Sequence, residues 1–409
     1  MKILVLTPYL PSPPNTGGRR RMHALISRLS LAHEVTVLSF VGADGETDAV
    51  AATRLIAKRV VTVTNGMTNA TGRHKRVLQL RSMLGRSSFA RLVFFTDEMQ
   101  RTIDRLSREQ RFDLVLVEFA HMACYAMPAS AAVVLDEHNV EYDVIRRSWR
   151  GERGLFRKAF NFAEYLKLRA EERRAWSRVD GCIFTSERDR ALALAAGCET
   201  PTSVAPNGVD VESFASDVQM RAGDILFFGA DFFPNTDALR FYADEVFPEV
   251  LRQRPSARLV VVGACAGALA DRPRAGVELI GPVADVRRYI ARSAVVIAPL
   301  RIGGGTRLKI LEAMAMGRAV VATTIGAEGI EVTPGRDLLI GDDAKTLATE
   351  TLRVLRDPEL AETIGAAARE LVTRRYDWDV SVAQLVRFVR GLVAPRHSYW
   401  LASERERAS

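Results

Sequence analysis

Residues 295–317 read VVIAPLRIGGGTRLKILEAMAMG, and this stretch decides the fold class of the chain. Its apolar, β-branched start predicts a buried strand, its three glycines predict a loop, and the apolar spacing after them predicts a helix. Thr306 suits the N-cap of that helix, and Gly317 suits the position just past its end. A strand, a glycine loop and a helix in this order are typical of an α/β protein.

The same glycine loop predicts a binding site for an anion. Glycines let backbone amides approach a ligand closely, and the free amides and dipole of a helix N-terminus favour negative charge. Arg307 and Lys309 lie in the first turn of the predicted helix, where cations oppose the dipole unless a phosphate is bound. Glu312 lies on an apolar face of the helix, and its carboxylate either accepts hydrogen bonds from a ribose or pairs with Lys309.

Outward from this segment, short β-branched runs alternate with helical patterns along the whole chain. The predicted strands of the first half are Ile3–Thr7, Val35–Phe40, Val60–Thr64, Leu114–Val117, Val133–Asp136 and Cys182–Thr185. Those of the second half are Ile225–Gly229, Arg258–Gly263, Val277–Ile280, Val295–Pro299, Val320–Thr323 and Leu338–Ile340. We expect each half to form its own parallel, doubly wound sheet with helices on both faces.

The length of the chain supports this division, because 409 residues exceed the size at which one hydrophobic core stops growing. A strand-like run in residues 202–208 ends in Pro-Asn-Gly, a turn signal that predicts the hinge. We expect an N-terminal domain over 1–208 and a C-terminal domain over 209–376. Residues 377–409 should form a helix that packs back on the N-terminal domain, followed by a polar tail.

The composition is that of a globular protein, with 48% hydrophobic and 26% charged residues. The first apolar stretch is stopped by Pro8, and no later run reaches the length of a membrane span. The four cysteines form no CxxC pair, which predicts neither a zinc site nor a disulfide framework and favours a cytoplasmic location.

The formal net charge of +8 leaves two interpretations open. Arginine-rich runs such as 19–21, 73–76 and 173–174 are either solvated helix faces or a surface that attracts anionic lipids or phosphorylated substrates. The amphipathic helix predicted over Leu155–Arg178 leaves the same choice, between core packing and contact with a membrane or an acceptor. Nucleic acid is disfavoured, because no aromatic-interleaved basic motif accompanies the charge.

Two loops of the N-terminal half are further candidates for a site. Gly17 and Gly18 follow the first predicted strand and lead into a helix, so they form either the second wall of a ligand cleft or a tight turn. His138 follows the strand Val133–Asp136 among carboxylates. It either hydrogen-bonds a sugar hydroxyl or is a structural histidine.

Other nucleotide-binding and metal-binding motifs are absent from the sequence. The glycines of Gly263–Gly267 have the wrong spacing for the dinucleotide fingerprint, and no Walker A sequence occurs. Asp377-Trp378-Asp379 has the spacing of the metal-binding DxD motif of some sugar transferases. It opens a helical segment, however, so we interpret it as a helix cap and expect no metal site.

With these residues in hand, the chain resembles the retaining family 4 glycosyltransferases of the GT-B fold over nearly its whole length. The resemblance rests on the Gly17-Gly18 loop, His138, the hinge Pro206–Asp210, and the donor segment Gly303–Gly317 with its continuation Gly326–Gly329. It implies two Rossmann-like domains that face each other across a cleft. It also implies transfer of a sugar from a nucleotide-sugar donor with retained anomeric configuration and without a metal.

The resemblance also assigns roles to residues. The implied catalytic residues are His138, Arg307 and Lys309. The implied donor-binding residues are Gly17, Gly18, Arg21, Gly229, Asn235, Gly303, Gly304, Gly305, Thr306, Glu312, Glu328 and Gly329.

Two departures from the family pattern matter. The earlier glutamate of the E-x7-E pair would fall at Gly304, and the usual Arg and Lys after the first strand of the C-terminal domain are replaced within Gly229–Asn235. We therefore expect Arg307 and Lys309 to neutralise the donor phosphates in their place. This variant is similar to a subset of bacterial exopolysaccharide transferases.

By family frequency a UDP-sugar is the expected donor and a GDP-sugar the next, with a glycan, a lipid-linked molecule or a small molecule as acceptor. The expected location is cytoplasmic, with peripheral contact at an anionic membrane as a further option. A GT-B nucleotide-sugar epimerase or hydrolase, and a non-catalytic nucleotide-sugar-binding protein, remain the alternatives. A sugar phosphorylase would need a cofactor lysine, for which the sequence has no motif.

Overall fold

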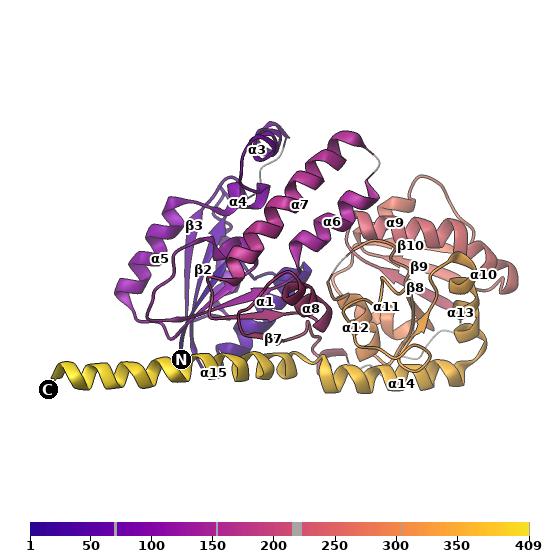
Figure 1. Cartoon of the computed structure of the whole chain (residues 1–409). Helices are drawn as coiled ribbons and strands as arrows, with labels where there is room; N and C mark the ends of the chain where they lie inside the picture. The colour runs from indigo at the N-terminus through magenta and orange to yellow at the C-terminus, as the bar shows by residue number, and fades with distance from the viewer. Residues whose placement is uncertain (69–71, 153, 215–222, 304, 409) are drawn as a thin grey trace. The chain divides into compact units, whose positions relative to one another are not determined.

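The computed structural model describes residues 1–68, 72–152, 154–214, 223–303 and 305–408, with side chains as far as Ala394. The chain divides into two compact units (Figure 1). Unit 1 comprises Met1–Ala205 and Ser381–Ser409, and unit 2 comprises Pro206–Val380. The chain thus passes from one unit to the other after Ala205 and again after Val380, close to the hinge and the last domain boundary expected from the sequence.

Unit 1 is built on a seven-stranded parallel sheet with the strand order β3-β2-β1-β4-β5-β6-β7. Its strands are β1 (Lys2–Thr7), β2 (Glu34–Val41), β3 (Arg59–Thr64), β4 (Leu114–Glu118), β5 (Ala132–Glu137), β6 (Gly181–Phe184) and β7 (Thr202–Val204). The order reverses between β1 and β4, which makes their carboxyl ends the place where a doubly wound sheet binds ligands.

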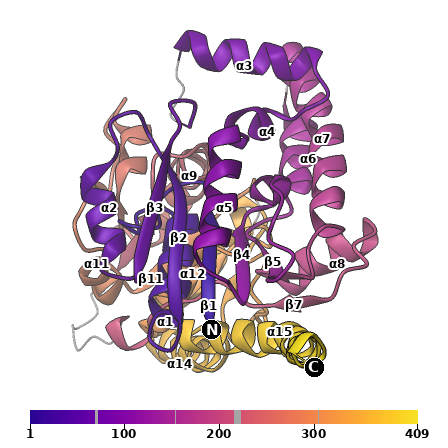
Figure 2. The same cartoon turned by 90° about the vertical axis from the view of Figure 1, so that its left-hand side faces the viewer.

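Helices cover both faces of this sheet (Figure 2). They are α1 (Gly17–Leu29), α2 (Thr47–Arg54), α3 (Gly72–Leu84), α4 (Phe89–Phe94), α5 (Asp97–Glu109), η1 (Ala120–Cys124), α6 (Glu141–Gly151), α7 (Leu155–Trp176), α8 (Glu187–Ala195) and the unit 1 part of α15 (Trp378–Ala408). Unit 1 has one apolar cluster on each face of its sheet, and alternate residues of β1 point into the two clusters. Ile3 packs with α1 and α15, and Leu4 packs with α5.

Unit 2 repeats the architecture with a six-stranded parallel sheet of order β10-β9-β8-β11-β12-β13. Its strands are β8 (Asp224–Phe228), β9 (Arg258–Val262), β10 (Val277–Gly281), β11 (Val295–Ala298), β12 (Ala319–Ala322) and β13 (Leu339–Ile340). Its helices are η2 (Glu212–Phe214), α9 (Phe233–Phe241), η3 (Tyr242–Val246), α10 (Phe247–Gln253), η4 (Ala264–Leu269), α11 (Arg287–Arg292), α12 (Leu308–Ala315), α13 (Ala344–Arg356) and α14 (Pro358–Arg375). Here the strand order reverses between β8 and β11.

The predicted fold class is confirmed, and each of the twelve predicted strands is present with ends that differ by one residue at most. The strand-like run before the hinge forms β7, at the edge of unit 1. Asp377 caps α15 as expected, because its Oδ1 atom accepts a hydrogen bond of 2.8 Å from the amide of Asp379. Gly317 ends α12 with a φ of +63°, and the amides of Gly317 and Arg318 bind the carbonyls of Met314 and Ala313.

The apolar residues of α7, for which the sequence left core packing and surface contact both open, are exposed, with Leu155 82% and Leu166 51% accessible. The chain beyond the expected last helix is also helical, since α15 continues to Ala408. Among the described helices, none combines the length and the apolar character that crossing a membrane requires.

Candidate active site

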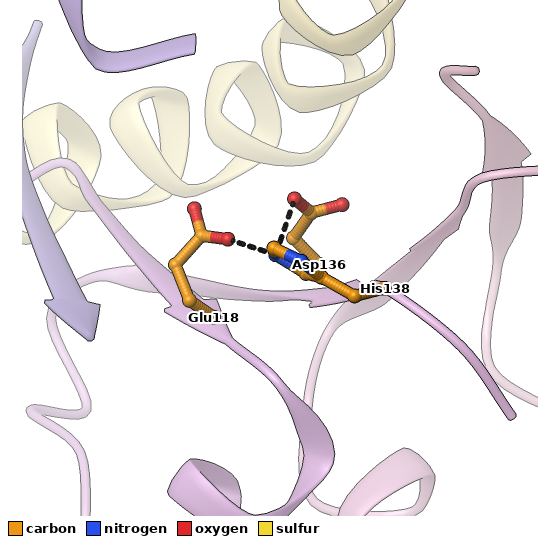
Figure 3. Close-up of side chains that lie close together, drawn as sticks. All are labelled: Glu118, Asp136 and His138. Carbon is orange, nitrogen blue, oxygen red and sulfur yellow. Dashed lines mark hydrogen bonds and ion pairs between the residues drawn. The ribbon is translucent and has the colours of Figure 1, made fainter. Parts of the chain in front are cut away.

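A buried cluster of titratable side chains lies at the carboxyl edge of the unit 1 sheet (Figure 3). Glu118 ends β4, Asp136 lies near the end of β5, and His138 follows β5. The parallel register pairs Glu118 with Asp136 and so brings the three groups together. The Nε2 atom of His138 lies 2.7 Å from Glu118 Oε2 and 3.6 Å from Asp136 Oδ2.

Arg21 of α1 completes this cluster. Its Nε and Nη2 atoms donate hydrogen bonds of 2.7 and 2.6 Å to the two oxygens of Asp136, and its Nη1 atom donates one of 2.9 Å to the carbonyl of Ala205. Burial alone would raise the pKa of Asp136, but the charge and hydrogen bonds of Arg21 hold that pKa below its usual range. The Arg21 side chain is fully buried, and its guanidinium holds the Asp136 carboxylate in place.

The cluster fits a proton network better than a metal site. Glu118, Asp136 and His138 are the one group of potential metal ligands found among the described residues, and a cation there would lie beside the Arg21 guanidinium. Burial lowers the pKa of His138 to about 3, so its imidazole is neutral. Burial and then the charge of Asp136 raise the pKa of Glu118 well above its usual value. A protonated Glu118 can donate to Nε2 of His138, which leaves the ring proton on Nδ1.

The Nδ1 side of His138 faces the predicted glycine loop. Helix α1 begins at Gly17, after Thr16, whose side chain accepts a hydrogen bond from the amide of Arg19. A Cβ atom added to Gly18 would lie 2.5 Å from Tyr9 Oη and 3.6 Å from His138 Nδ1, so only glycine fits here without displacing a neighbour. The structure therefore brings Gly18, the N-terminus of α1 and a neutral imidazole together at the carboxyl ends of the strands.

The predicted site of unit 2 lies where β11 leads into α12, and its helix cap differs from our expectation. Helix α12 begins at Leu308, so Arg307 and not Thr306 is the N-cap residue, and no side chain caps the first turn. Thr306 instead packs against the chain at Gly329, where an added Cβ atom would lie 3.3 Å from Thr306 Oγ1. The amides at the start of α12 thus have no side-chain cap, as an anion site requires.

Lys309 points back from α12 to the end of β8. Its Nζ atom donates a hydrogen bond of 2.8 Å to Asn235 Oδ1 and would lie 3.2 Å from a Cβ atom on Gly229. The ammonium also lies 4.5 Å from the centre of the Phe227 ring. Burial lowers the pKa of Lys309 to about 8, although Cys265 and Glu312 oppose that shift. The ammonium group of Lys309 therefore lies beside residues 229–235, where the family pattern has an Arg and a Lys that this chain lacks.

Other predicted donor-binding residues lie on the loop before α12, on α12 itself and at the turn that contains Gly329. Gly303 has a φ of +138°, and a Cβ atom there would lie 2.4 Å from Arg307 Nη2, so the guanidinium folds over the glycine. Gly305 also has a left-handed backbone, with a φ of +72°. Glu312 is buried on α12, and Glu328 is partly buried beside Gly329. Gly304, where the missing glutamate would stand, lies outside the described residues.

Sequence reasoning missed the partners of His138. We placed the end of the β4 strand at Val117, so Glu118 fell in a loop and its carboxylate went unnoticed. A carboxylate at the last position of a buried strand was the signal that could have found it. The buried acid Glu172 was also missed, although it accepts hydrogen bonds from the amides of Glu141 and Tyr142 at the start of α6.

Comparison with known proteins gives a consistent result. Residues 15–213 match the family described as Glycosyltransferase Family 4, and residues 222–357 match the one described as Glycosyl transferases group 1. A 44.6 kDa protein of the cps region of Klebsiella pneumoniae is 22% identical over 92% of this chain and 96% of its own length. The phosphatidyl-myo-inositol mannosyltransferase of Mycobacterium tuberculosis is 34% identical, over 51% of this chain and 59% of its own length.

Solved structures agree on the fold. The crystal structure of Anabaena HepE in complex with UDP superposes with a TM-score of 0.67 and 16% identity. The match covers 96% of this chain and all of that one. At this identity the similarity concerns the fold alone.

Proposed function

Since this chain belongs to the family 4 glycosyltransferases of the GT-B fold, we propose that it takes its sugar from a UDP-sugar, or next from a GDP-sugar, with retention of anomeric configuration. The acceptor would be a glycan, a lipid-linked molecule or a small molecule in polysaccharide or glycoconjugate biosynthesis. A UDP complex of a structural neighbour and a cps-region relative support this choice.

The position of Lys309 is the observation that carries the proposal. Its ammonium lies beside Gly229 and Asn235, and Arg307 stands at the N-terminus of the same helix. Negative charge grows on the nucleoside diphosphate as its bond to the sugar breaks. Two cations and the N-terminus of α12, which has no side-chain cap, would stabilise that charge in the transition state. Arg307 and Lys309 would supply the positive charge that a metal ion supplies in some other sugar transferases, so we expect activity to persist in EDTA.

The unit 1 cluster would act on the sugar. A proton on Nδ1 of His138 makes this atom a donor toward the sugar oxygens, and the amides at the start of α1 favour a partial negative charge. Glu312 is assigned to the ribose, in line with its burial on α12. On this assignment unit 2 holds the leaving group and unit 1 orients the sugar ring.

A thermal-shift panel of UDP-, GDP-, ADP- and dTDP-sugars tests the donor. A ligand at a hundred times its Kd stabilises a fold by about 2.7 kcal/mol, which corresponds to a rise in Tm of roughly 5–10 °C. We expect Lys309→Ala to lose this shift and Glu312→Ala to weaken nucleotide binding in calorimetry. Lys345→Ala, an exposed lysine of α13, is the matched control. Equal shifts in Lys309→Ala and wild type would refute the role of Lys309.

Product analysis then separates transfer from the alternatives. A transferase forms a glycoside only when an acceptor is present, whereas an epimerase or a hydrolase converts the donor by itself. Arg307→Ala and Lys309→Ala should each lower turnover by roughly one to three orders of magnitude. Binding of donor without any turnover would identify a non-catalytic nucleotide-sugar-binding protein.

The exposed apolar residues of α3 and α7 support contact with an anionic membrane surface. Figures 1 and 2 show α3 and the start of α7 beyond the carboxyl ends of the unit 1 strands. The exposed apolar side chains there are Val77, Leu80, Met83, Leu84, Leu155, Phe156, Phe162 and Leu166. Exposed basic residues accompany them at 73, 75, 76, 157 and 158. Apolar side chains with neighbouring cations are typical of helices that lie on anionic lipid.

Vesicle sedimentation tests this contact. Leu155→Asp/Phe156→Asp should lower binding to vesicles of phosphatidylglycerol and phosphatidylcholine, because both side chains are more than four-fifths exposed. Leu31→Asp/Leu55→Asp is the control, since these two leucines of unit 1 are equally exposed but lie outside α3 and α7. Equal binding of both variants, or no binding of the wild type, would contradict the proposal.

A further inference from the structure

A hollow in unit 1 has a strongly basic lining. Its cavity of about 200 Å³ lies between α4, η1 and α7. Four arginines line it: Arg86 before α4, Arg91 on α4, Arg174 on α7 and Arg178 just after α7. Ser87, His121, Cys124 and Glu171 also line it, together with three alanines.

The positive charge of this hollow is not balanced by the protein. Glu171 is its one acidic lining residue, and that carboxylate accepts hydrogen bonds of 2.9 and 2.5 Å from the amide and the hydroxyl of Ser88. Within the part of the chain that the structure describes, the guanidinium groups of Arg86, Arg174 and Arg178 form no hydrogen bond or ion pair. The four arginines share one hollow, and the guanidinium of Arg91 also lies 4.8 Å from the centre of the Phe95 ring.

The chemistry of the lining matches a phosphate group. Guanidinium groups bind phosphate oxygens in pairs, through parallel N–H donors. The volume corresponds to roughly seven water molecules at about 30 Å³ each, which is room for a phosphate or a diphosphate. His121 adds a neutral ring, because burial lowers its pKa to about 4, and its Nε2 atom is buried without a hydrogen-bond partner.

A row of stacked rings connects this hollow to the cluster around His138. The ring of Phe119 lies 5.5 Å from that of His121 and 3.8 Å from that of His138. One aromatic side chain therefore separates the arginine-lined hollow from the imidazole to which we assign the sugar.

We propose that the hollow lined by Arg86, Arg91, Arg174 and Arg178 is an acceptor subsite that binds a phosphate or diphosphate group of the acceptor. This inference rests on the proposed function and narrows its acceptor to a phosphorylated molecule. The phosphate would belong either to a soluble sugar phosphate or to a lipid. The exposed apolar residues of α3 and α7 offer a place for the hydrocarbon chain in the second case.

Calorimetry with inorganic pyrophosphate and the full chain tests the subsite. Pyrophosphate also fits the proposed donor site, so the wild type should show two binding events. Arg174→Ala/Arg178→Ala should remove one event, Lys309→Ala the other, and all three substitutions together should weaken binding at least tenfold. Both arginines are exposed, so their removal should leave the fold intact. Arg101→Ala/Arg169→Ala, the same charge change at exposed positions outside the hollow, is the control and should bind as the wild type does.

The two proposals can fail separately. An unchanged titration in Arg174→Ala/Arg178→Ala, or an equal loss in the control, overturns the acceptor subsite and leaves the donor site standing. If the wild type shows only the binding event that Arg174→Ala/Arg178→Ala removes, the proposed donor site fails and the acceptor subsite stands.

Two further probes distinguish the sources of the phosphate. Weaker sedimentation of Arg174→Ala/Arg178→Ala than of the control with vesicles of phosphatidic acid and phosphatidylcholine assigns the subsite to a lipid phosphate. Loss of glucose 1-phosphate binding with unchanged sedimentation assigns it to a soluble acceptor.

Discussion

Raising the pH should switch off the enzyme through Lys309. Burial lowers the pKa of this ammonium to about 8, and the nearby charge of Arg307 acts in the same direction. The cation that neutralises the diphosphate is therefore lost as the pH rises through 8. At pH 9 only about one-tenth of the free enzyme keeps the charge, so kcat/KM should fall roughly tenfold between pH 7 and pH 9. A bound diphosphate favours the charged form, so kcat should fall only at higher pH.

Initial rates of donor turnover between pH 6 and pH 10 measure this effect, with kcat and kcat/KM determined separately. Lys309→Arg keeps a charge that does not titrate in this range, so the alkaline fall should disappear even if the rate is lower. Lys309→Met should be slow at every pH. A profile of kcat/KM that stays flat to pH 10 in the wild type, or a fall that persists in Lys309→Arg, would refute the reasoning.

Three further perturbations test other features. Glu118→Gln should keep most of kcat, because its amide can donate to His138. Glu118→Leu cannot donate and should lower kcat roughly tenfold (about 1.4 kcal/mol). Equal rates of the two variants would contradict the proton network. Burial raises the pKa of Glu172 to about 8 beside Glu137. The native state therefore binds more protons than the unfolded state between about pH 4.5 and pH 8, and stability should fall with rising pH by up to about 1.4 kcal/mol per unit. Glu172→Gln should reduce that slope in urea unfolding, and an unchanged slope would contradict the raised pKa of Glu172. Gly317→Ala should cost about 1 kcal/mol in the same assay, because its left-handed backbone disfavours a side chain; stability equal to the wild type would rule this out.

The fold could be predicted because its signals are local. Each buried strand is a short apolar run, and the glycine loops after β1 and β11 interrupt the chain where a strand passes into a helix. The sequence left the environment of α7 open for a related reason. Apolar residues at helical spacing define a face of a helix, but the sequence does not say what that face contacts.

The site could be predicted only in part, because its contacts are long-range. His138, Gly18 and Lys309 could be named from their positions beside strands and glycine loops and from the family resemblance. The hydrogen bond between Lys309 and Asn235 joins residues 74 apart, and that between Arg21 and Asp136 joins residues 115 apart. Arg21 illustrates the difficulty: it belongs to an arginine run next to a glycine loop, and only the fold shows that it is buried.

The division of unit 1 between the two ends of the chain affects the order in which the protein can be completed during synthesis. Val382, Leu385 and Val389 of α15 belong to the same apolar cluster as β1, and Phe388 and Leu392 press against Gly181 of β6. The ribosome makes these residues only after all of unit 2. The first unit to emerge is therefore the last to close, and until the final helix arrives it exposes an apolar sheet face that a chaperone can recognise.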